Sequence, residues 1–443
     1  MFYLIIFYSH LIRMAGRVRL AVTGLQDQWL TGEPQFSYFV MNYRRHTRFS
    51  TEMVEIPFTF TAESGRKPQF GNSITCRIPN NMGDLLRSVT LKVTLDPLPA
   101  SDSELVSNTY NTSIGTRIIE HADLIIGGQL IERLTGDYVY MYDQLHNNID
   151  DTEQTLYFMT GHNNHIQFSN PYTFYVNLPF YFFRHPSLSV PLCALTKQLV
   201  EIRIQFKSSD DKISYSYDKQ FTDTWAVIPT NDGAIKNVSL LTDFYFVTDD
   251  EKNFLRSRPT EYVITQVQAA TIPFGPNVLS RSVMTHFKHP VKELYFMARL
   301  QERITVTQNG KQVLSGIVAE SDRTLYLSDE IDVRSDVRFI KNISMEFNEA
   351  KVFDHGRLQL SYQQSLDHHT GCPSPAYEFY TYSFALQPEV YYPTGQVNMS
   401  RIRHQKLNIE LDETDALNDI HVSVYAVNYN VLHVESGLAG LKF

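Results

Sequence analysis

The sequence predicts an all-β protein, because a two-residue hydrophobic alternation recurs along the chain. The alternation is clearest in Val200–Lys207, where apolar and polar residues alternate without a break. Side chains point to alternate faces of a pleated strand, so the apolar residues of this segment must share one face. The composition, with 13% aromatic residues and 19 prolines, also favours strands and turns over helices.

Further strands are expected wherever the alternation recurs, each with one buried face. These segments are Val54/Ile56/Phe58/Phe60, Val89/Leu91/Val93/Leu95, Leu358/Leu360/Tyr362, Leu407/Ile409/Leu411 and Val422/Val424/Ala426. Hairpins are expected over Asp123–Ile131 and around Asn309-Gly310, where Asn-Gly tolerates the positive φ of a two-residue turn. Only short helices are expected, at Gly136–Leu145 and Asp250–Leu255.

The length of 443 residues exceeds what one hydrophobic core usually serves. We divide the chain into an N-terminal arm (1–51), a first β-rich domain (52–248), a linker (249–261) and a second β-rich domain (262–443). The two domains share an order of parts, which predicts a duplicated sandwich. Long connections between successive strands suit Greek keys, so the expected architecture is two tandem eight-stranded jelly-roll β-sandwiches, a double jelly roll.

The first residues of the chain are apolar but do not look like a membrane span or a secretory signal. Residues 1–13 are too short to cross a bilayer and lack a basic n-region and a small-residue cleavage site. Because Met14 offers a second start, we interpret residues 1–13 as an upstream-start artefact; a membrane-touching or partner-binding arm is the alternative. The three cysteines, Cys76, Cys193 and Cys372, form no disulfide framework, so a reducing compartment is expected.

The sequence offers no catalytic motif. It contains no G-x-S-x-G, P-loop, G-x-G-x-x-G or H-E-x-x-H sequence. Three groups have spacings that suggest metal ligands: His286 and His289 with Glu293, His162 with His165, and Asp367-His368-His369. In strand or loop context, however, residues three apart point to opposite faces and cannot easily share an ion. We therefore predict no enzyme activity, no cofactor and no metal site.

One basic cluster stands out against a net charge of −9, which itself argues against a nucleic-acid coat. The cluster consists of Arg44, Arg45, His46 and Arg48 and follows several aromatic residues. It is either a solvated charge run or a docking site for an acidic partner or anionic lipid. On a lipid surface, each basic residue would add about 1 kcal/mol.

Four asparagines open N-x-S/T triplets and are candidate glycosylation sites: Asn111, Asn237, Asn342 and Asn398. The motif is so short that four occurrences in a chain of this length are expected by chance. They therefore carry no functional conclusion by themselves.

A series of segments follows the order found in one protein family. They are Asp27–Gln35 leading into Asn42–Phe49, Phe70-Gly71 through Ile78–Leu86, Ile126–Ile131, Leu178–Phe182, Pro191–Leu195, Phe287–Leu294, Tyr382–Glu389 and Asn428–Gly437. Together they resemble the major capsid proteins of the nucleocytoplasmic large DNA viruses, which include iridoviruses, phycodnaviruses and their giant-virus relatives. The resemblance covers nearly the whole chain after Met14, but Ser101–Ser113 and Ser208–Asn231 match nothing specific.

The resemblance implies a structural role with two jelly rolls per subunit. Three subunits would form a capsomer with a pseudo-hexagonal outline, and capsomers would tile an icosahedral shell over an internal membrane. The expected location is the virion capsid, assembled in the host cell cytoplasm. The expected partners are further copies of the chain (a homotrimer, then neighbouring capsomers), minor capsid and penton proteins, and the internal membrane through the N-terminal arm. No direct contact with nucleic acid is expected.

Judged by composition alone, one other class stays open. A carbohydrate-binding or polysaccharide-processing β-sandwich could also use the many Tyr and Phe residues. Light scattering separates the two classes, because the capsid interpretation requires a stable trimer.

Overall fold

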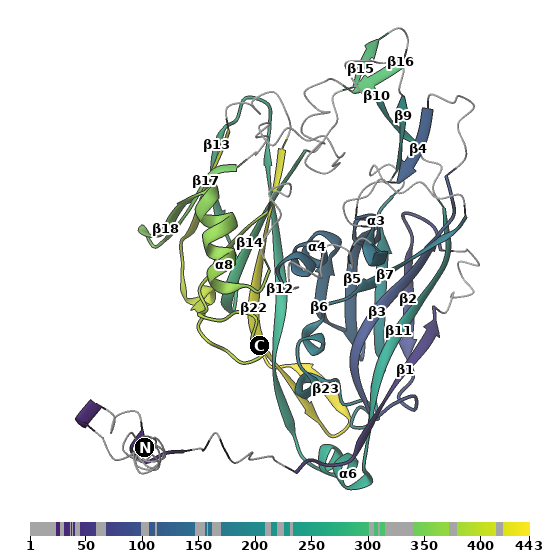
Figure 1. The fold of residues 1–443 in the computed structure, drawn as a ribbon, viewed down its shortest axis with the longest axis vertical. Coiled ribbons are helices and arrows are strands. Elements are labelled where there is room, and N and C mark those ends of the chain that lie inside the picture. The colour runs from purple at the N-terminus through teal and green to yellow at the C-terminus, as the bar shows by residue number, and fades with distance from the viewer. Residues whose placement is uncertain are drawn as a thin grey trace, which may run out of the picture. The chain divides into compact units, whose positions relative to one another are not determined.

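The structure is a computed structural model of the whole chain, which forms two compact units, Met1–Arg48 and Phe49–Phe443. It describes residues 24–443 outside 27–30, 36, 38, 40–44, 59–67, 99–105, 111–112, 147–155, 157, 162–169, 209–213, 219–225, 231–233, 301–304, 309–310, 315–339, 372–378 and 413–419. Within the larger unit, antiparallel strands form two successive sets of paired sheets (Figure 1).

The first set has two four-stranded sheets. One has the order β1 (Phe49–Pro57), β11 (Ile235–Val247), β3 (Leu85–Leu95) and β7 (Tyr172–Asn177). The other has the order β2 (Ser73–Ile78), β8 (Val200–Phe206), β5 (Ile119–Ile126) and β6 (Gln129–Thr135). Short helical segments join some of these strands: α3 (Ile114–Arg117), α4 (Gly136–Leu145), η1 (Tyr181–Phe183) and η2 (Pro186–Leu188).

The second set repeats this arrangement. One sheet has the order β12 (Thr260–Phe274), β22 (Ile420–Glu435), β14 (Pro290–Leu300) and β19 (Phe379–Ser383), with β20 (Val397–Asn398) and β23 (Leu438–Leu441) added at its margins. The other has the order β13 (Ser280–Thr285), β21 (Gln405–Leu411), β17 (Ile340–Phe347) and β18 (Ala350–Gly356). The helix α6 (Asp249–Ser257) lies between the sets, and η3 (Gln359–Gln363), α8 (Gln364–His368) and η4 (Met399–Arg401) lie within the second.

The two sets have the same topology. When the strands of these four-stranded sheets are numbered in chain order within each set, one sheet reads 1-8-3-6 and its partner 2-7-4-5, in both sets. Each set is thus an eight-stranded antiparallel sandwich with crossing connections, the jelly roll, in which two sheets protect most strand edges. The predicted double jelly roll is confirmed. We refer below to the first and second jelly rolls.

Most of the predicted local elements are present. β8 alternates between buried and less buried residues along its whole length, as expected. The Asp123–Ile131 hairpin forms from β5 and β6, with Gly127 and Gly128 at positive φ in the turn. β15 (Thr305–Gln308) pairs antiparallel with β16 (Lys311–Leu314), so the predicted hairpin is present, although Asn309-Gly310 itself lies outside the described residues.

Both predicted helices are also present, with α6 slightly longer than Asp250–Leu255. One predicted strand, however, is wrong. Leu358, Leu360 and Tyr362 lie at the start of a helical segment, η3 followed by α8. Leu360 is buried, whereas Leu358 is 61% exposed, so the three residues do not share a dry face. Three alternating positions are too few to separate a strand from one turn of helix.

The two central segments that match nothing specific in sequence pair with each other. β4 (Val106–Tyr110) lies antiparallel to β9 (Ser214–Asp218), which also pairs with β10 (Ala226–Thr230). Much of Ser101–Ser113 and Ser208–Asn231 is therefore one small sheet, although the rest of these segments lies outside the described residues.

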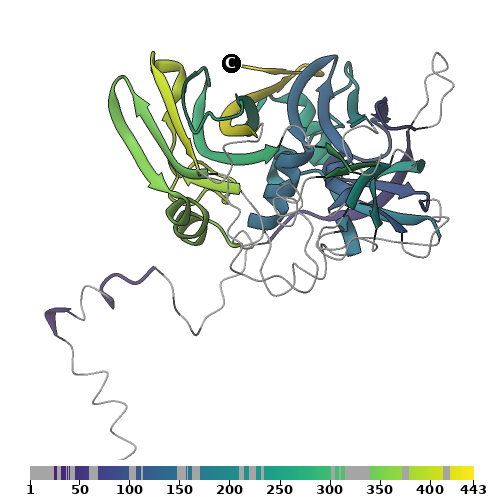
Figure 2. The same cartoon turned by 90° about the horizontal axis from the view of Figure 1, so that it is seen from above.

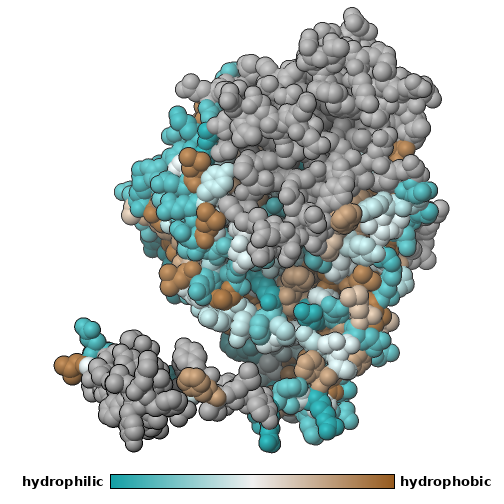
Figure 3. Space-filling model, viewed as in Figure 1, coloured by the Kyte–Doolittle hydropathy of each residue, from teal (hydrophilic) through white to brown (hydrophobic). Residues whose placement is uncertain are grey.

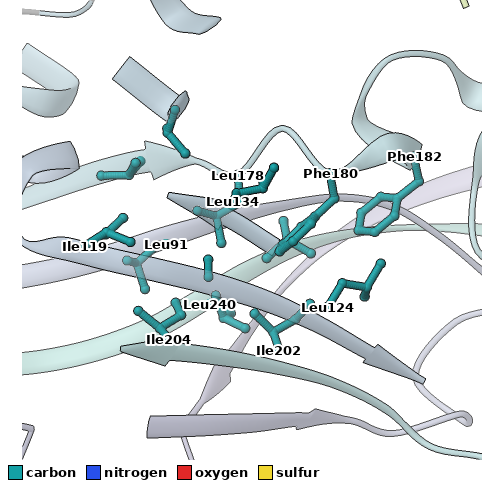
Figure 4. Close-up of a cluster of buried hydrophobic side chains, with 14 of the residues drawn as sticks. Leu91, Ile119, Leu124, Leu134, Leu178, Phe180, Phe182, Ile202, Ile204 and Leu240 are labelled. Carbon is teal, nitrogen blue, oxygen red and sulfur yellow. The ribbon is translucent and has the colours of Figure 1, made fainter. Parts of the chain in front are cut away.

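The hydrophobic core of the first jelly roll lies between its two sheets. Leu91 and Leu240 from one sheet meet Ile202 and Ile204 from the other, with Phe180 packed nearby (Figure 4). The second jelly roll has its own apolar cluster, which includes Phe296, Ile343 and Leu407. Large apolar side chains thus fill both interiors.

The first core does not stop at the first jelly roll. It continues into the second through Tyr295, Met297, Phe379, Tyr425 and Val427, and Figure 2 shows the strands of the two jelly rolls beside one another. As a result, β22 is buried on both faces from Val424 to Asn430. The expectation of a single dry face is therefore wrong for this strand, because its second face packs against the other jelly roll.

On the surface, hydrophobic residues of the described part lie scattered among hydrophilic ones on the face seen in Figure 3. Among the described residues, no helix combines the length and the apolar character that crossing a membrane would require.

Candidate functional site: the junction of the two jelly rolls

The junction between the jelly rolls is built around helix α4. Thr135 caps this helix by accepting a hydrogen bond from the Tyr138 backbone N–H at 3.2 Å. The Tyr138 ring then meets Tyr295 of β14 edge to face, with centroids 5.7 Å apart, and lies 6.3 Å from the ring of Tyr425 in β22. Nearly every residue of α4 is buried, because the helix is covered by both jelly rolls.

Polar contacts complete the junction at the other end of the interface. Gln266 of β12 donates to the backbone carbonyl of Ile131, and the Ala439 N–H donates to Gln198 Oε1 at 2.6 Å. The Lys197 N–H donates to the Gly437 carbonyl at 3.2 Å. Apolar packing and satisfied backbone groups together hold the two jelly rolls in one orientation.

Two opposite charges are buried beside this junction. Lys292 Nζ lies 2.9 Å from Glu293 Oε1, and both side chains are at most 2% exposed. Neighbours on a regular strand point to opposite faces, but β14 has a bulge between Val291 and Glu293, and a bulge re-aims side chains. Lys292 also donates to the Pro388 carbonyl at 2.6 Å. The pair is thus both ion-paired and hydrogen-bonded, as a buried pair must be.

Next to this ion pair, three potential ligand groups meet. His146, just after α4, and His369 and Glu389, from the second jelly roll, offer ligand atoms that all lie within 4.8 Å of one another. His369 Nδ1 is 3.4 Å from Glu389 Oε1, and His369 Nε2 is 3.5 Å from Glu293 Oε2. Neither His369 nitrogen makes a hydrogen bond, although the side chain is only 1% exposed.

The protonation states of this cluster follow from burial and from neighbouring charges. Burial, together with the charge of His369, lowers the pKa of His146 to about 3. Burial disfavours the Glu389 carboxylate, but the contact with His369, the charge of His146 and the hydrogen bonds from Thr370 outweigh it and lower the pKa of Glu389 to about 2. Burial lowers the pKa of Lys292 to about 8. At neutral pH, His146 is therefore a neutral imidazole beside an ionised Glu389.

The group Asp367-His368-His369 does not lie on a strand, as the prediction of no metal site had assumed. Asp367 and His368 end helix α8 and His369 follows it, so the strand argument does not apply to them. Of these three, His369 alone is buried. The partners His146 and Glu389 were missed, because they are distant in sequence and no spacing rule links them to His369.

Of the other two histidine groups, the one within the described residues forms no such cluster. His286 is exposed and His289 half-buried, whereas Glu293 is turned towards Lys292 and His369. His162 and His165 lie outside the described residues.

The predicted basic cluster belongs to the N-terminal unit. Arg45, His46 and Arg48 are exposed, and Arg44 lies outside the described residues. His46 Nδ1 donates to the Thr47 carbonyl at 2.8 Å. The docking role of these residues stays a prediction.

The candidate glycosylation sites fall in different environments. Asn237 and Asn398 are exposed, and Asn398 Oδ1 accepts a hydrogen bond from the Ser400 N–H. Asn342 is half-buried and donates to Asp354 Oδ1 at 2.7 Å, whereas Asn111 lies outside the described residues. Glycosylation at these positions stays a prediction.

Comparisons with solved structures show the same fold. Over 92% of this chain and 100% of the other, the structure superimposes on VP54 of the virus PBCV-1 with a TM-score of 0.71 at 20% identity. It superimposes on the Faustovirus major capsid protein with a TM-score of 0.66 at 13% identity, over 94% and 95% of the two chains.

Comparisons of sequence point the same way. The chain is 29% identical to the major capsid protein of Pyramimonas orientalis virus, over 97% of this chain and 99% of that protein. It is 27% identical to that of Paramecium bursaria Chlorella virus 1, over 97% and 100%. The family model "Major capsid protein N-terminus" matches residues 37–248, and "Large eukaryotic DNA virus major capsid protein" matches residues 251–440. The chain therefore belongs to the major capsid proteins of large eukaryotic DNA viruses.

Proposed function

We propose that three copies of this chain form a capsomer with a pseudo-hexagonal outline, and that capsomers tile an icosahedral shell. The observation that carries this proposal is the repeat of one strand order in two jelly rolls that share a core. Two similar bodies held rigidly side by side let three chains approximate six-fold packing. Identical trimers can then meet six neighbours through closely related contacts.

Assembly takes the place of catalysis in this proposal. A shell subunit needs rigid, self-complementary sides, and obligate contacts of this kind bury about 2,000–5,000 Å² with apolar centres. The shared core and the buried ion pair next to it serve this rigidity, because they leave the jelly rolls little freedom to rotate against each other.

We also propose the domain limits and the wider setting. The boundary between the jelly rolls falls in α6, between the end of β11 at Val247 and the start of β12 at Thr260. Assembly takes place in the host cell cytoplasm, with minor capsid and penton proteins as further partners. The small sheet formed by β4, β9 and β10 knits the trimer or shapes its exterior.

Light scattering on the purified full-length chain tests the trimer. The expected mass is three times that of the 51.2 kDa chain and stays constant on dilution. A monomer at micromolar concentration would contradict the proposal and would favour the glycan-binding class instead.

The N-terminal arm is proposed to dock on the internal membrane. It carries exposed basic side chains at Arg45 and Arg48 and an aromatic side chain, Phe39, that is 97% exposed. Reversing the charge of Arg44 and Arg45 to Glu should abolish binding to vesicles that contain anionic lipid, while the trimer mass is retained. Neutral vesicles are the control. Equal binding of the variant and the parent chain to the anionic vesicles would contradict the docking role.

A further inference from the structure

We propose that His146, His369 and Glu389 bind a zinc ion that fastens the first jelly roll to the second. Two imidazole nitrogens and one carboxylate oxygen are a donor set that zinc accepts, with a fourth position for water. His146 comes from the first jelly roll, whereas His369 and Glu389 come from the second. The ion would therefore be a clamp at the junction, and its role goes beyond shell assembly.

The unpaired nitrogens of His369 are the main evidence. A buried imidazole normally finds hydrogen-bond partners, because an unpaired buried polar group destabilises the folded state. His369 faces two carboxylates, but its contacts of 3.4 and 3.5 Å are longer than the roughly 2.7–2.9 Å of a charge-assisted hydrogen bond.

The spacing of the ligand atoms fits a bound zinc ion better than it fits hydrogen bonds between the side chains. With zinc bonds of about 2.0–2.2 Å, two ligands of a tetrahedral site lie about 3.3–3.6 Å apart. The 3.4 Å between His369 Nδ1 and Glu389 Oε1 already has this value. All ligand atoms lie within 4.8 Å of one another, so a shift of about 1 Å closes the site to the same geometry.

The surroundings orient each ligand for this role. His146 Nδ1 is 3.1 Å from the Tyr142 carbonyl, which can only accept, so Nδ1 carries the proton and Nε2 is left as the ligand atom. Glu293 Oε2 faces the far nitrogen of His369 and has no hydrogen-bond partner of its own. Metal-bound histidines commonly give their second N–H to such an outer carbonyl or carboxylate.

Glu389 is fixed in a similar way. Its two carboxylate oxygens accept hydrogen bonds from the Thr370 backbone N–H at 2.8 Å and from the Thr370 hydroxyl at 2.5 Å. The backbone on either side of the junction is also tied together, because the Gly371 N–H donates to the Leu145 carbonyl at 2.6 Å. The ligands are therefore held close together by contacts that need no ion.

Titration of the chelator-treated, full-length protein with zinc chloride, against a competing chromophoric chelator, tests the proposal. One tight site per chain is expected. The H146N and E389Q variants should each bind zinc at least about 10-fold more weakly. His368, next to His369 but less buried, provides the matched control, and H368N should bind like the parent chain.

A spectroscopic readout uses the parent chain alone. Cobalt added to the parent chain in place of zinc should give the intense visible absorption of a tetrahedral site, and excess zinc should abolish it. Zinc should also raise the melting temperature of the parent and of H368N but not of E389Q. Zinc affinity that is equal in the parent, H146N and E389Q, or the absence of a tetrahedral cobalt spectrum, would overturn the proposal and leave the cluster a metal-free hydrogen-bonding group.

Discussion

The Tyr138 ring of the first jelly roll meets the Tyr295 ring of the second edge to face, with centroids 5.7 Å apart. Both rings are fully buried, and both belong to the core that runs through the two jelly rolls. This contact lies in the shared core of the two jelly rolls, so changes at the junction should alter the stability of the whole chain.

Replacing Tyr138 by Ala should destabilise the protein by about 3–5 kcal/mol, because it removes a buried ring and leaves a cavity between the jelly rolls. Y138F is the matched control. The Tyr138 hydroxyl is buried without a hydrogen-bond partner, so its removal should cost almost nothing. Denaturant unfolding measures both. Similar losses in Y138A and Y138F would show that the ring packing is unimportant.

Breaking the buried ion pair should also be costly. K292M leaves Glu293 as an unpaired buried charge and should destabilise the protein by about 3–5 kcal/mol. The double variant K292M/E293Q should recover part of this loss, because no net charge is then stranded. As the control, K351M removes one partner of an exposed pair, Lys351 with Asp354 at 2.6 Å, and should leave the melting temperature nearly unchanged. Equal effects of K292M and K351M would contradict the prediction.

Glu132 should make stability depend on pH. Burial raises the pKa of Glu132 to about 8, against the opposing charge of Arg184 and a hydrogen bond from the Tyr181 N–H. The folded state therefore holds a proton that the unfolded chain releases near its usual pKa of about 4.3. By linkage, this contribution to stability is fully present below that value and is lost as pH rises towards 8.

The E132Q variant isolates this effect, because a neutral amide cannot ionise and can still accept the Tyr181 N–H. Melting temperatures measured from pH 6 to 9 should show E132Q gaining on the parent chain as pH rises. A difference that stays constant with pH would mean that Glu132 does not titrate in this range.

Alanine substitutions at two glycines compare the cost of backbone strain alone with the cost of strain plus a steric clash. Gly128 and Gly437 both lie in hairpin turns at positive φ, which costs a side-chain-bearing residue about 1–2 kcal/mol. A Cβ at Gly128 would meet nothing within 4 Å, whereas one at Gly437 would lie 2.5 Å from Thr196 Oγ1 in the first jelly roll. G437A should therefore lower the melting temperature more than G128A. The reverse order would show that the β22–β23 turn does not seat against the first jelly roll.

Local periodicity and turn chemistry were enough to predict much of the fold. The alternation in β8, the glycines of the β5–β6 turn and the helix Gly136–Leu145 all depend on neighbouring residues, and all were predicted correctly. The helical segment at Leu358–Tyr362 was missed, because three alternating residues also fit one helical turn.

The junction could not be predicted in the same way, because it depends on contacts between distant segments. In sequence, Lys292 and Glu293 look like exposed charges on a strand, and only the bulge in β14 and the second buried face of its sheet bring them together inside. His146 and His369 likewise become neighbours only after both jelly rolls have formed. Sequence spacing carries no signal for such a cluster.

Electron-microscopic class averages of the purified full-length protein would show the proposed trimer itself. We expect three-fold particles with six lobes of two alternating kinds, one lobe for each jelly roll of three chains. Isolated two-lobed particles, or rings without three-fold symmetry, would contradict it.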